Sequence, residues 1–297
     1  MERIPLIVST DWLEQRLDDP KLRIVDATTF MDIPENGGPP SVESGRASYD
    51  EGHIPGAVYA DLLNELSDPE SSLPFMAPPH EHFVKKMTEL GVGDGTYTVI
   101  YDQGALVENP VVAAYWASRL AWQMQYEGYD NIAILDGGLP KWKEEGRPLT
   151  AVPGNYSPAV FTGQRRPELI ATKEDVRQAM EDDNVVLINS LSPEDFRGET
   201  DTYPRKGHIP NSVNIFFGIH GDQQTKQVYA DSILREPFEK VGALDPGKKV
   251  ITYCGGGIAA TWNALLLNKL GQKNVAVYDG SMNEWASDPS CPLVTGN

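Results

Sequence analysis

Short apolar runs rich in β-branched residues alternate along this chain with longer stretches whose apolar residues recur at helical spacing. The runs that predict strands cover residues 22–26, 98–101, 132–135, 185–188, 249–253 and 275–278. Helical spacing is clearest over residues 79–90, 111–126, 173–182 and 259–270. Strands that alternate with helices in this way are typical of an α/β fold, in which helices cover both faces of a parallel sheet.

A long internal repeat organises these elements. Three segments occur twice, in the same order: His-Ile-Pro at 53–55 recurs at 208–210, Val-Ile-Tyr-Asp at 99–102 recurs as Ile-Thr-Tyr-Cys at 251–254, and Leu-Asp-Gly-Gly at 135–138 recurs as Tyr-Asp-Gly-Ser at 278–281. The offsets of 155, 152 and 143 residues are longer than the period of solenoid repeats. They fit two copies of one domain.

The stretch between the two copies predicts a linker. Residues 151–168 hold three prolines and two glycines and show no strong periodicity. We therefore expect a first domain at residues 1–150 and a second at residues 169–297. Residues 32–45, which are rich in proline, glycine and acids, are expected to form a surface loop.

Composition limits the partners of this protein. The 297 residues are 40% hydrophobic, which supports full cores, and the net charge is −18, from 25 Lys and Arg against 43 Asp and Glu. This negative charge repels phosphate backbones and anionic lipids, so neither nucleic acid nor a membrane is an expected partner. The N-terminal residues lack a long apolar segment, so a cytoplasmic location is expected. Two packed domains are sufficient for a monomer, which is the expected state.

The two cysteines, Cys254 and Cys291, form neither a zinc-binding pair nor a disulfide framework. Cys254 stands where an apolar run breaks into three glycines and then into a helical stretch. At a helix N-terminus, unpaired backbone N–H groups and the helix dipole stabilise a thiolate, and glycines let successive N–H groups point into one concavity. A buried cysteine packed as a small hydrophobe is the alternative, and the glycine turn argues against it. Cys291 lacks such a turn and is expected to be incidental.

Five motifs in the duplicated halves make the chain resemble the tandem-domain rhodanese family, which includes thiosulfate and 3-mercaptopyruvate sulfurtransferases. The motifs are Gly-His-Ile-Pro-Gly at 52–56, Leu-Asp-Gly-Gly-Leu-Pro-Lys-Trp at 135–142, Phe-Arg-Gly at 196–198, Gly-His-Ile-Pro at 207–210 and Tyr-Cys-Gly-Gly-Gly-Ile-Ala-Ala at 253–260. The resemblance implies two rhodanese-like domains, with a catalytically silent first domain and the active site of the second at the cleft between them. Asp102 stands in the first copy where Cys254 stands in the second.

The resemblance also implies the chemistry of Cys254. Its thiolate would attack the outer sulfur of a small anionic donor, thiosulfate or 3-mercaptopyruvate, and keep that sulfur as a persulfide. A thiol, cyanide or a thioredoxin-like acceptor would then remove it. The charged sulfur would be stabilised by the backbone N–H groups of Gly255, Gly256, Gly257, Ile258 and Ala259. No motif indicates a metal, nucleotide or flavin, so no cofactor is expected.

An anionic donor beside a thiolate needs fixed positive charge. Arg197, in Phe-Arg-Gly, and Arg205, in Tyr-Pro-Arg-Lys, lie where the resembled enzymes place substrate-binding arginines. A guanidinium suits the paired oxygens of a carboxylate or a sulfonate. A structural ion pair with a nearby acid is the alternative for Arg197.

The chain departs from the 3-mercaptopyruvate enzymes at a proposed proton relay of serine, histidine and aspartate. Gly256 stands in place of the loop serine, and Phe75 stands in place of the histidine. Asp61 matches the aspartate and is a candidate contributor across the domain interface. Because two of the three relay members are missing, the resemblance does not choose between the two donors.

Two other functions are open to the sequence. A cysteine phosphatase needs an arginine that closes its phosphate loop, and the seven residues after Cys254 contain none. A sulfur carrier that passes a persulfide to a protein partner would need only the cysteine and its loop. Arg197 and Arg205 favour an enzyme over a carrier, since buried arginines without an anionic ligand are destabilising.

Overall fold

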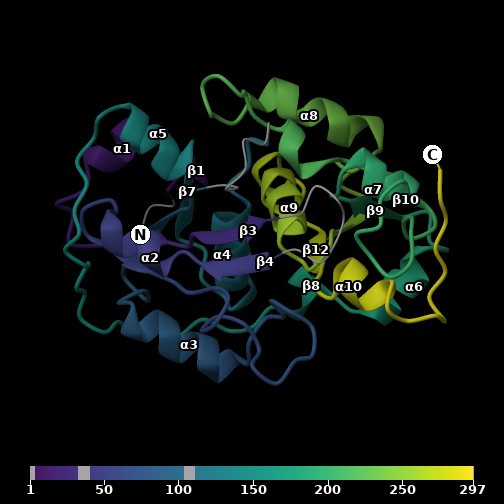
Figure 1. Cartoon of the computed structure of the whole chain (residues 1–297), viewed down its shortest axis with the longest axis horizontal. Coiled ribbons are helices and arrows are strands. Elements are labelled where there is room, and N and C mark those ends of the chain that lie inside the picture. The colour runs from purple at the N-terminus through teal and green to yellow at the C-terminus, as the bar shows by residue number, and fades with distance from the viewer. Residues whose placement is uncertain (1–3, 33–40, 104–110, 297) are drawn as a thin grey trace.

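Two parallel sheets of five strands each lie side by side and form the frame of the molecule (Figure 1). The computed structural model describes residues 4–32, 41–103 and 111–296. The first sheet has the strand order β1-β7-β6-β2-β5, and the second has the order β10-β9-β11-β12-β8. Both orders are the same once β5 is matched with β10 and β2 with β9. The α/β fold with two parallel sheets, predicted from the repeat, is confirmed.

The elements of both halves have the following bounds. The first half contains β1 (Ile7–Val8), α1 (Thr10–Glu14), β2 (Leu22–Asp26), β3 (Thr29–Asp32), β4 (Ser41–Ser44), α2 (Arg46–Glu51), β5 (Ala57–Tyr59), α3 (His80–Glu89), β6 (Tyr97–Tyr101), α4 (Tyr115–Tyr126), β7 (Ile132–Leu135) and α5 (Gly138–Glu144). The second half contains η1 (Pro167–Leu169), β8 (Ile170–Ala171), α6 (Lys173–Ala179), β9 (Val185–Asn189), α7 (Pro193–Arg197), β10 (Ser212–Asn214), η2 (Phe217–Ile219), α8 (Asp231–Lys240), β11 (Lys249–Tyr253), α9 (Ala259–Lys269), β12 (Val275–Tyr278) and α10 (Ser281–Trp285).

All six predicted strands are present, but two other expectations are wrong. The helix expected from residue 111 begins only at Tyr115, because Ala114 has a φ of −91° and a ψ of 59°, outside the helical region. The surface loop expected over 32–45 is in part a ribbon, since β3 and β4 pair antiparallel with Thr29 opposite Ser44. Residues 33–40 of that expected loop lie outside the described residues.

Alternate residues of each strand face opposite sides of its sheet and enter different cores. In β6, Tyr97, Val99 and Tyr101 pack with residues of α1, α2 and α5 on the outer face. Ile100 faces the other way, into a core that contains α3, α4, α8 and α9 and draws residues from both sheets. A third core lies between the second sheet and helices α6 and α10. Helices therefore cover both faces of each sheet, and the central core is common to the two domains.

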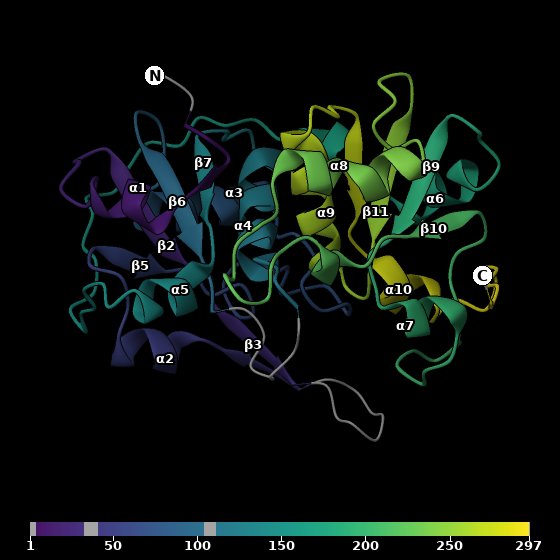
Figure 2. The ribbon, with the colours of Figure 1, turned by 90° about the horizontal axis from the view of Figure 1, so that it is seen from above.

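Helices α4 and α9 join the two halves, as Figure 2 shows near the middle of the molecule. All twelve residues of α4 are buried, including the polar residues Arg119, Gln123 and Gln125, so the helix is enclosed on every side. Ser118 Oγ of α4 lies 2.9 Å from Thr261 Oγ1 of α9. These two residues are separated by 143 positions, the offset of the third repeated segment. Equivalent residues of the two copies thus meet at the domain interface.

Residues 151–166 carry no helix or strand and run along the first domain. Asp94 donates its backbone N–H to the Val160 carbonyl (2.7 Å), and Arg166 donates to the Tyr126 carbonyl (2.7 Å). The domain boundaries at residues 150 and 169 stay a prediction.

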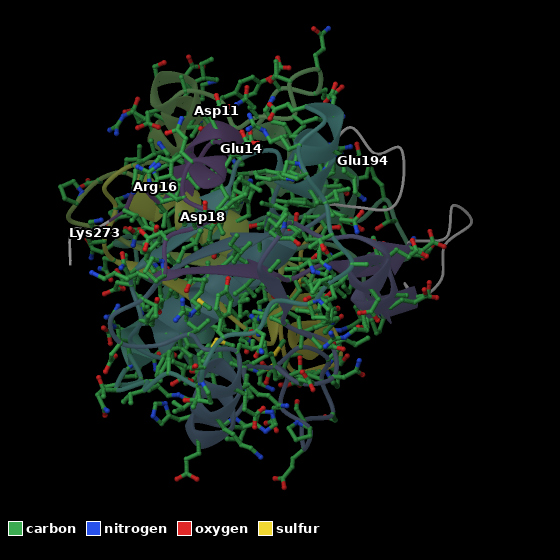
Figure 3. All side chains as sticks on the ribbon, turned by 90° about the vertical axis from the view of Figure 1, so that its left-hand side faces the viewer. Asp11, Glu14, Arg16, Asp18, Glu194 and Lys273 are labelled. Carbon is green, nitrogen blue, oxygen red and sulfur yellow. The ribbon has the colours of Figure 1, made fainter. Side chains whose placement is uncertain are left out.

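Acidic side chains stand out from the surface around α1, where Figure 3 shows Asp11, Glu14 and Asp18.

None of the helices in the described ranges combines the length and the apolar composition needed to cross a lipid bilayer.

Candidate active site

Cys254 lies at the carboxyl end of β11, immediately before the loop that leads into α9, and is 2% exposed. Its backbone N–H donates to Ser281 Oγ (3.1 Å), and its carbonyl accepts from the N–H of Met282 (3.0 Å). Ser281 has a φ of 47°, in the left-handed region that side chains rarely adopt. The start of α10 therefore fixes the backbone of Cys254, whose side chain is buried at the edge of the central apolar core.

The loop after Cys254 leaves its N–H groups available. Within the part of the chain that the structure describes, the backbone N–H groups of Gly255, Gly256, Gly257 and Ile258 donate to no protein acceptor. Gly257 and Ile258 are buried, and Gly255 and Gly256 are half-buried. Buried backbone N–H groups are nearly always paired, so the unpaired groups of Gly257 and Ile258 are unusual. We call these four groups the N–H cradle. Their position at the start of α9 adds the positive end of the helix dipole.

The first domain reaches this loop through Arg119 of α4. Its Nη1 donates to Asp279 Oδ1 (2.5 Å) and to the carbonyl of Gly257 (3.0 Å), and its Nη2 donates to the carbonyl of Phe75. Asp279 Oδ2 accepts the backbone N–H of Ala77 (2.8 Å). Arg119 and Asp279 are 1% and 2% exposed, so this is a buried ion pair across the domain interface.

Tyr203 covers the other side of the loop. Its hydroxyl lies so close to Gly255 that a Cβ at position 255 would collide with it. Burial raises the pKa of Tyr203 well above its ordinary value, and negative charge on Cys254 raises that pKa further. Tyr203 is therefore a neutral phenol next to the thiol.

Tyr203, Arg119 and Asp279 are not among the site residues predicted from the sequence. For Asp279 a signal was present, since the Asp-Gly pair at 279–280 also occurs at 136–137. Nothing in the sequence shows that Arg119, 135 positions before Cys254, would reach the cysteine loop.

The two arginines expected to bind substrate are held by other protein groups. Arg205 donates to the carbonyls of Trp285, Ala286, Asp288 and Cys291, at 2.6 to 2.9 Å. It therefore braces the segment after α10 and could bind a substrate only by giving up these bonds. Substrate binding by Arg205 stays a prediction, against which this structural role stands.

Arg197 forms the kind of ion pair that the sequence left as its alternative. Its Nε donates to Glu199 Oε1 (2.7 Å), and its Nη2 lies 3.3 Å from Glu194 Oε1. The pair is exposed to solvent, and such pairs exchange partners at little free energy. A substrate role for Arg197 stays a prediction that this geometry permits. Among the described residues, neither Arg197 nor Arg205 hydrogen-bonds to residues 254–259.

Asp61 and Phe75 have local roles in the first domain. Asp61 accepts from Ser44 Oγ (2.8 Å) and Asn64 Nδ2 (3.0 Å), and also from the backbone N–H groups of Leu63 and Asn64. It thus stabilises a turn, and its contribution across the interface stays a prediction. The Phe75 ring packs on Trp116, with ring centroids 5.3 Å apart, and offers no group that could move a proton.

Asp102 occupies the same backbone position as Cys254. Its carbonyl accepts from the N–H of Leu139 (3.0 Å), as that of Cys254 accepts from Met282. Its carboxylate accepts the N–H of Ala117 in the first turn of α4 (2.9 Å). In the first domain, a fixed carboxylate thus takes an N–H at the start of the helix that corresponds to α9.

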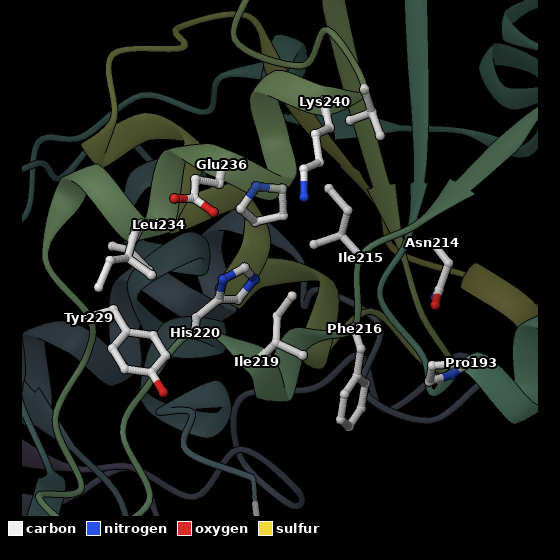
Figure 4. Close-up of a pocket in the computed structure, with 13 residues that line it drawn as sticks. Pro193, Asn214, Ile215, Phe216, Ile219, His220, Tyr229, Leu234, Glu236 and Lys240 are labelled. Atoms are coloured by element: carbon white, nitrogen blue, oxygen red, sulfur yellow. The ribbon is translucent and has the colours of Figure 1, made fainter.

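A separate hollow of about 480 Å³ opens beside α8 (Figure 4). His220, Tyr229, Glu236 and Lys240 line it together with apolar residues, and none of its lining residues belongs to the Cys254 loop. Burial lowers the pKa of His220 to about 4, and its Nε2 lies 2.8 Å from Asn263 Oδ1. Across residues 4–32, 41–103 and 111–296, no three His, Cys, Asp or Glu side chains come together in a way that could hold a metal ion.

Comparison with known proteins agrees with the repeat and the fold. The profile of the rhodanese-like domain matches residues 9–145 and again residues 172–288. The 3-mercaptopyruvate sulfurtransferase of Homo sapiens is 32% identical over 287 residues, which cover 94% of this chain and 91% of that protein. Sulfur carrier protein TtuD of Thermus thermophilus is 30% identical over 306 residues, with coverage of 98% and 97%.

A solved structure gives the same result. The structure of SseA from Escherichia coli represents the rhodanese fold of 3-mercaptopyruvate sulfotransferases. It matches this chain with a TM-score of 0.77 and 30% identity, over 94% of this chain and 99% of SseA. Two successive matches to one domain, a duplicated strand order and full-length relatives lead to one conclusion. The chain belongs to the family of proteins built from rhodanese-like domains, of which it contains two in tandem.

Proposed function

We propose that this protein is a sulfurtransferase that carries sulfur on Cys254. The observation that supports this most is the N–H cradle: four unpaired backbone N–H groups follow the only cysteine placed at a strand end in the described chain. Such a cradle stabilises negative charge on sulfur without a metal or a protonated side chain. The relatives named as sulfurtransferases perform chemistry of this class.

The reaction has two steps. The Cys254 thiolate attacks the outer sulfur of the donor, a new S–S bond forms, and the bond from that sulfur to the rest of the donor breaks. Thiosulfate would release sulfite, and 3-mercaptopyruvate would release pyruvate enolate, which then takes up a proton. In the second step a nucleophilic acceptor attacks the terminal persulfide sulfur, and Cys254 leaves as the thiolate. The acceptor is a thiol, cyanide or a thioredoxin-like protein.

The donor is a small anion in this proposal. Relatives named for thiosulfate and for 3-mercaptopyruvate are both about equally similar to this chain, at 30 to 32% identity. Arg197 is the candidate to meet the anion, because its present partners are exposed carboxylates. Action in the cytoplasm and as a monomer remain expectations from the sequence.

A sulfur carrier that hands its persulfide to a protein partner is the second candidate. One observation favours it: Arg119, Arg197 and Arg205 are all engaged by protein acceptors. A carrier does not need an arginine for a small donor. The similarity of this chain to a protein named as a sulfur carrier also supports the carrier function.

The mass of the intact protein separates these proposals. The protein is incubated with thiosulfate or with 3-mercaptopyruvate, without an acceptor, and then with cyanide. Gain of one sulfur atom that cyanide removes, present in Cys291→Ser and absent in Cys254→Ser, is the expected result. No gain with either donor would contradict the small-donor enzyme and favour the carrier, whereas a gain that persists in Cys254→Ser would contradict both.

A further inference from the structure

We propose that Arg119, a first-domain residue, is a positioning residue that keeps the N–H cradle of the second domain turned toward Cys254. This inference rests on the proposed function, because it deepens the role given to the loop. It assigns a task in sulfur transfer to the domain that lacks the cysteine.

Arg119 connects three separate segments with one guanidinium. Nη1 donates both to Asp279 after β12 and to the Gly257 carbonyl in the loop, and Nη2 donates to the Phe75 carbonyl of the first domain. A planar guanidinium can hold several acceptors in fixed directions at once, whereas an ammonium acts as a point charge. Asp279 neutralises the charge of Arg119, which allows the cation to be buried.

The contact with the Gly257 carbonyl determines where the next N–H points. A planar trans peptide directs its C=O and its N–H to opposite sides. When Arg119 holds the Gly257 oxygen, the N–H of Ile258 must point away from the arginine. A rotated peptide would instead present a carbonyl oxygen on the side of the cradle and repel an anionic sulfur.

Glycine makes such a rotation a real alternative at this position. Gly257 has a φ of 72°, and a Cβ there would lie 2.6 Å from Asp279 Oδ1. Only glycine fits this close approach to Asp279, and glycine is also the residue with the greatest backbone freedom. An external contact is needed to select one peptide orientation, and Arg119 supplies it.

The internal repeat separates this role from simple domain docking. Asp136, the first-copy counterpart of Asp279, accepts the backbone N–H of Val228 from the second domain (2.9 Å), as Asp279 accepts that of Ala77. Both aspartates thus hold a backbone N–H of the other domain. The residue 143 positions after Arg119 is Trp262, so the second copy supplies no arginine to Asp136. Docking recurs in both halves, but the arginine occurs only on the side of the cysteine.

The test measures the reactivity of Cys254 toward methyl methanethiosulfonate across pH in the full-length protein, with peptide mapping to separate Cys254 from Cys291. In Arg119→Gln we expect the pH profile of Cys254 to move to higher pH and its rate near pH 7 to fall about tenfold. Arg119→Lys keeps the charge beside Asp279, but all its donors lie on one nitrogen, whereas the three acceptors are shared between Nη1 and Nη2 of the arginine. The same shift is therefore expected at a smaller size. Asp136→Asn, the matched control at the other docking contact, should leave the profile unchanged.

The outcomes are separable. A profile in Arg119→Lys and Arg119→Gln that coincides with that of the unmodified protein would overturn the proposal, as would an equal shift in Asp136→Asn. A change in accessibility alone would scale the rate at every pH without moving the profile, and that result also counts against it. Cys291, which is 1% exposed, reports general loosening. The reagent transfers a methylthio group to the thiolate, releases methanesulfinate and forms a mixed disulfide, not a persulfide. The result therefore stands even if loading of Cys254 with sulfane sulfur fails.

Discussion

Arg197 and Arg205 stand eight residues apart but are held in different ways. Arg205 makes four hydrogen bonds to carbonyls that close the end of α10, and Arg197 makes an exposed pair with two glutamates. A charged donor lost from buried or half-buried carbonyls is destabilising, because the carbonyls lose their partners. An exposed ion pair contributes little.

This difference predicts opposite effects of two matched substitutions. Arg205→Met should lower the free energy of unfolding by about 3 kcal/mol. Arg197→Met should leave unfolding nearly unchanged and weaken loading of sulfur from a small anionic donor. Urea unfolding and the donor concentration for half-maximal loading are the two measurements. If Arg205→Met were as stable as the unmodified protein and failed to load sulfur, Arg205 would be a substrate ligand.

The residues that the sequence could identify are those whose role is local. A cysteine between a strand and a glycine turn is recognisable because strand, turn and helix N-terminus are adjacent in the chain. Arg119, Asp279 and Tyr203 could not be found in this way, since each reaches the loop only after distant segments pack together. Arg205 was matched by its position in a motif, and the sequence could not show that its guanidinium donates to four backbone carbonyls, because these carbonyls lie 80 to 86 residues further along the chain. Its role in substrate binding stays a prediction.

At the level of elements, the strands were predictable and the ends of helices were less so. A strand buried on both faces reads as a continuous apolar run, and β2, β7, β11 and β12 have the predicted bounds. The ribbon of β3 and β4 escaped notice, because its pairing depends on backbone hydrogen bonds rather than on apolar side chains. The first helical turn expected before Tyr115 was also wrong, since periodicity does not mark where a helix starts.

A buried histidine ties η2 to α9 and makes this contact sensitive to pH. His220 is 1% exposed, and burial lowers its pKa to about 4 from an ordinary value near 6.5. Between these values the unfolded chain binds a proton that the folded protein does not. The contribution of His220 to the free energy of unfolding is therefore fully present above pH 6.5. It is lost as the pH drops toward 4, and the loss amounts to about 3 kcal/mol.

Urea unfolding between pH 7 and pH 4 tests this contribution. The loss of stability over that range should be smaller in His220→Gln, which removes the titrating group and keeps an amide to meet Asn263. Carboxylates that titrate in the same range affect both proteins alike. An identical loss in the two proteins would show that His220 does not control it.

For the whole molecule, the shared core predicts that the two domains unfold together. The central core draws on both sheets, and α4 and α9 are buried along their contact. Cooperative unfolding follows where a large apolar interface links two domains. Scanning calorimetry should therefore show one transition.

A charge placed at the contact between α4 and α9 should weaken the interface between the domains. Ser118→Lys buries an ammonium opposite Thr261, with no partner there to neutralise it, and should split the transition into two or lower its midpoint strongly. Ser232→Lys, on the exposed side of α8, is the matched control and should keep one transition. Two separate transitions in the unmodified protein would contradict the prediction.

The meeting of Ser118 with Thr261 also bears on descent. Where equivalent residues face each other across an axis, one sequence used twice can satisfy both sides, as in a homodimer of single-domain chains. A one-domain ancestor that paired with itself through this helix would have had two identical cysteine loops. Because one gene would have encoded both loops, any mutation would have changed both. After two gene copies fuse, each copy can mutate independently. One half was then free to lose its thiol and to place an arginine where the other half keeps a tryptophan.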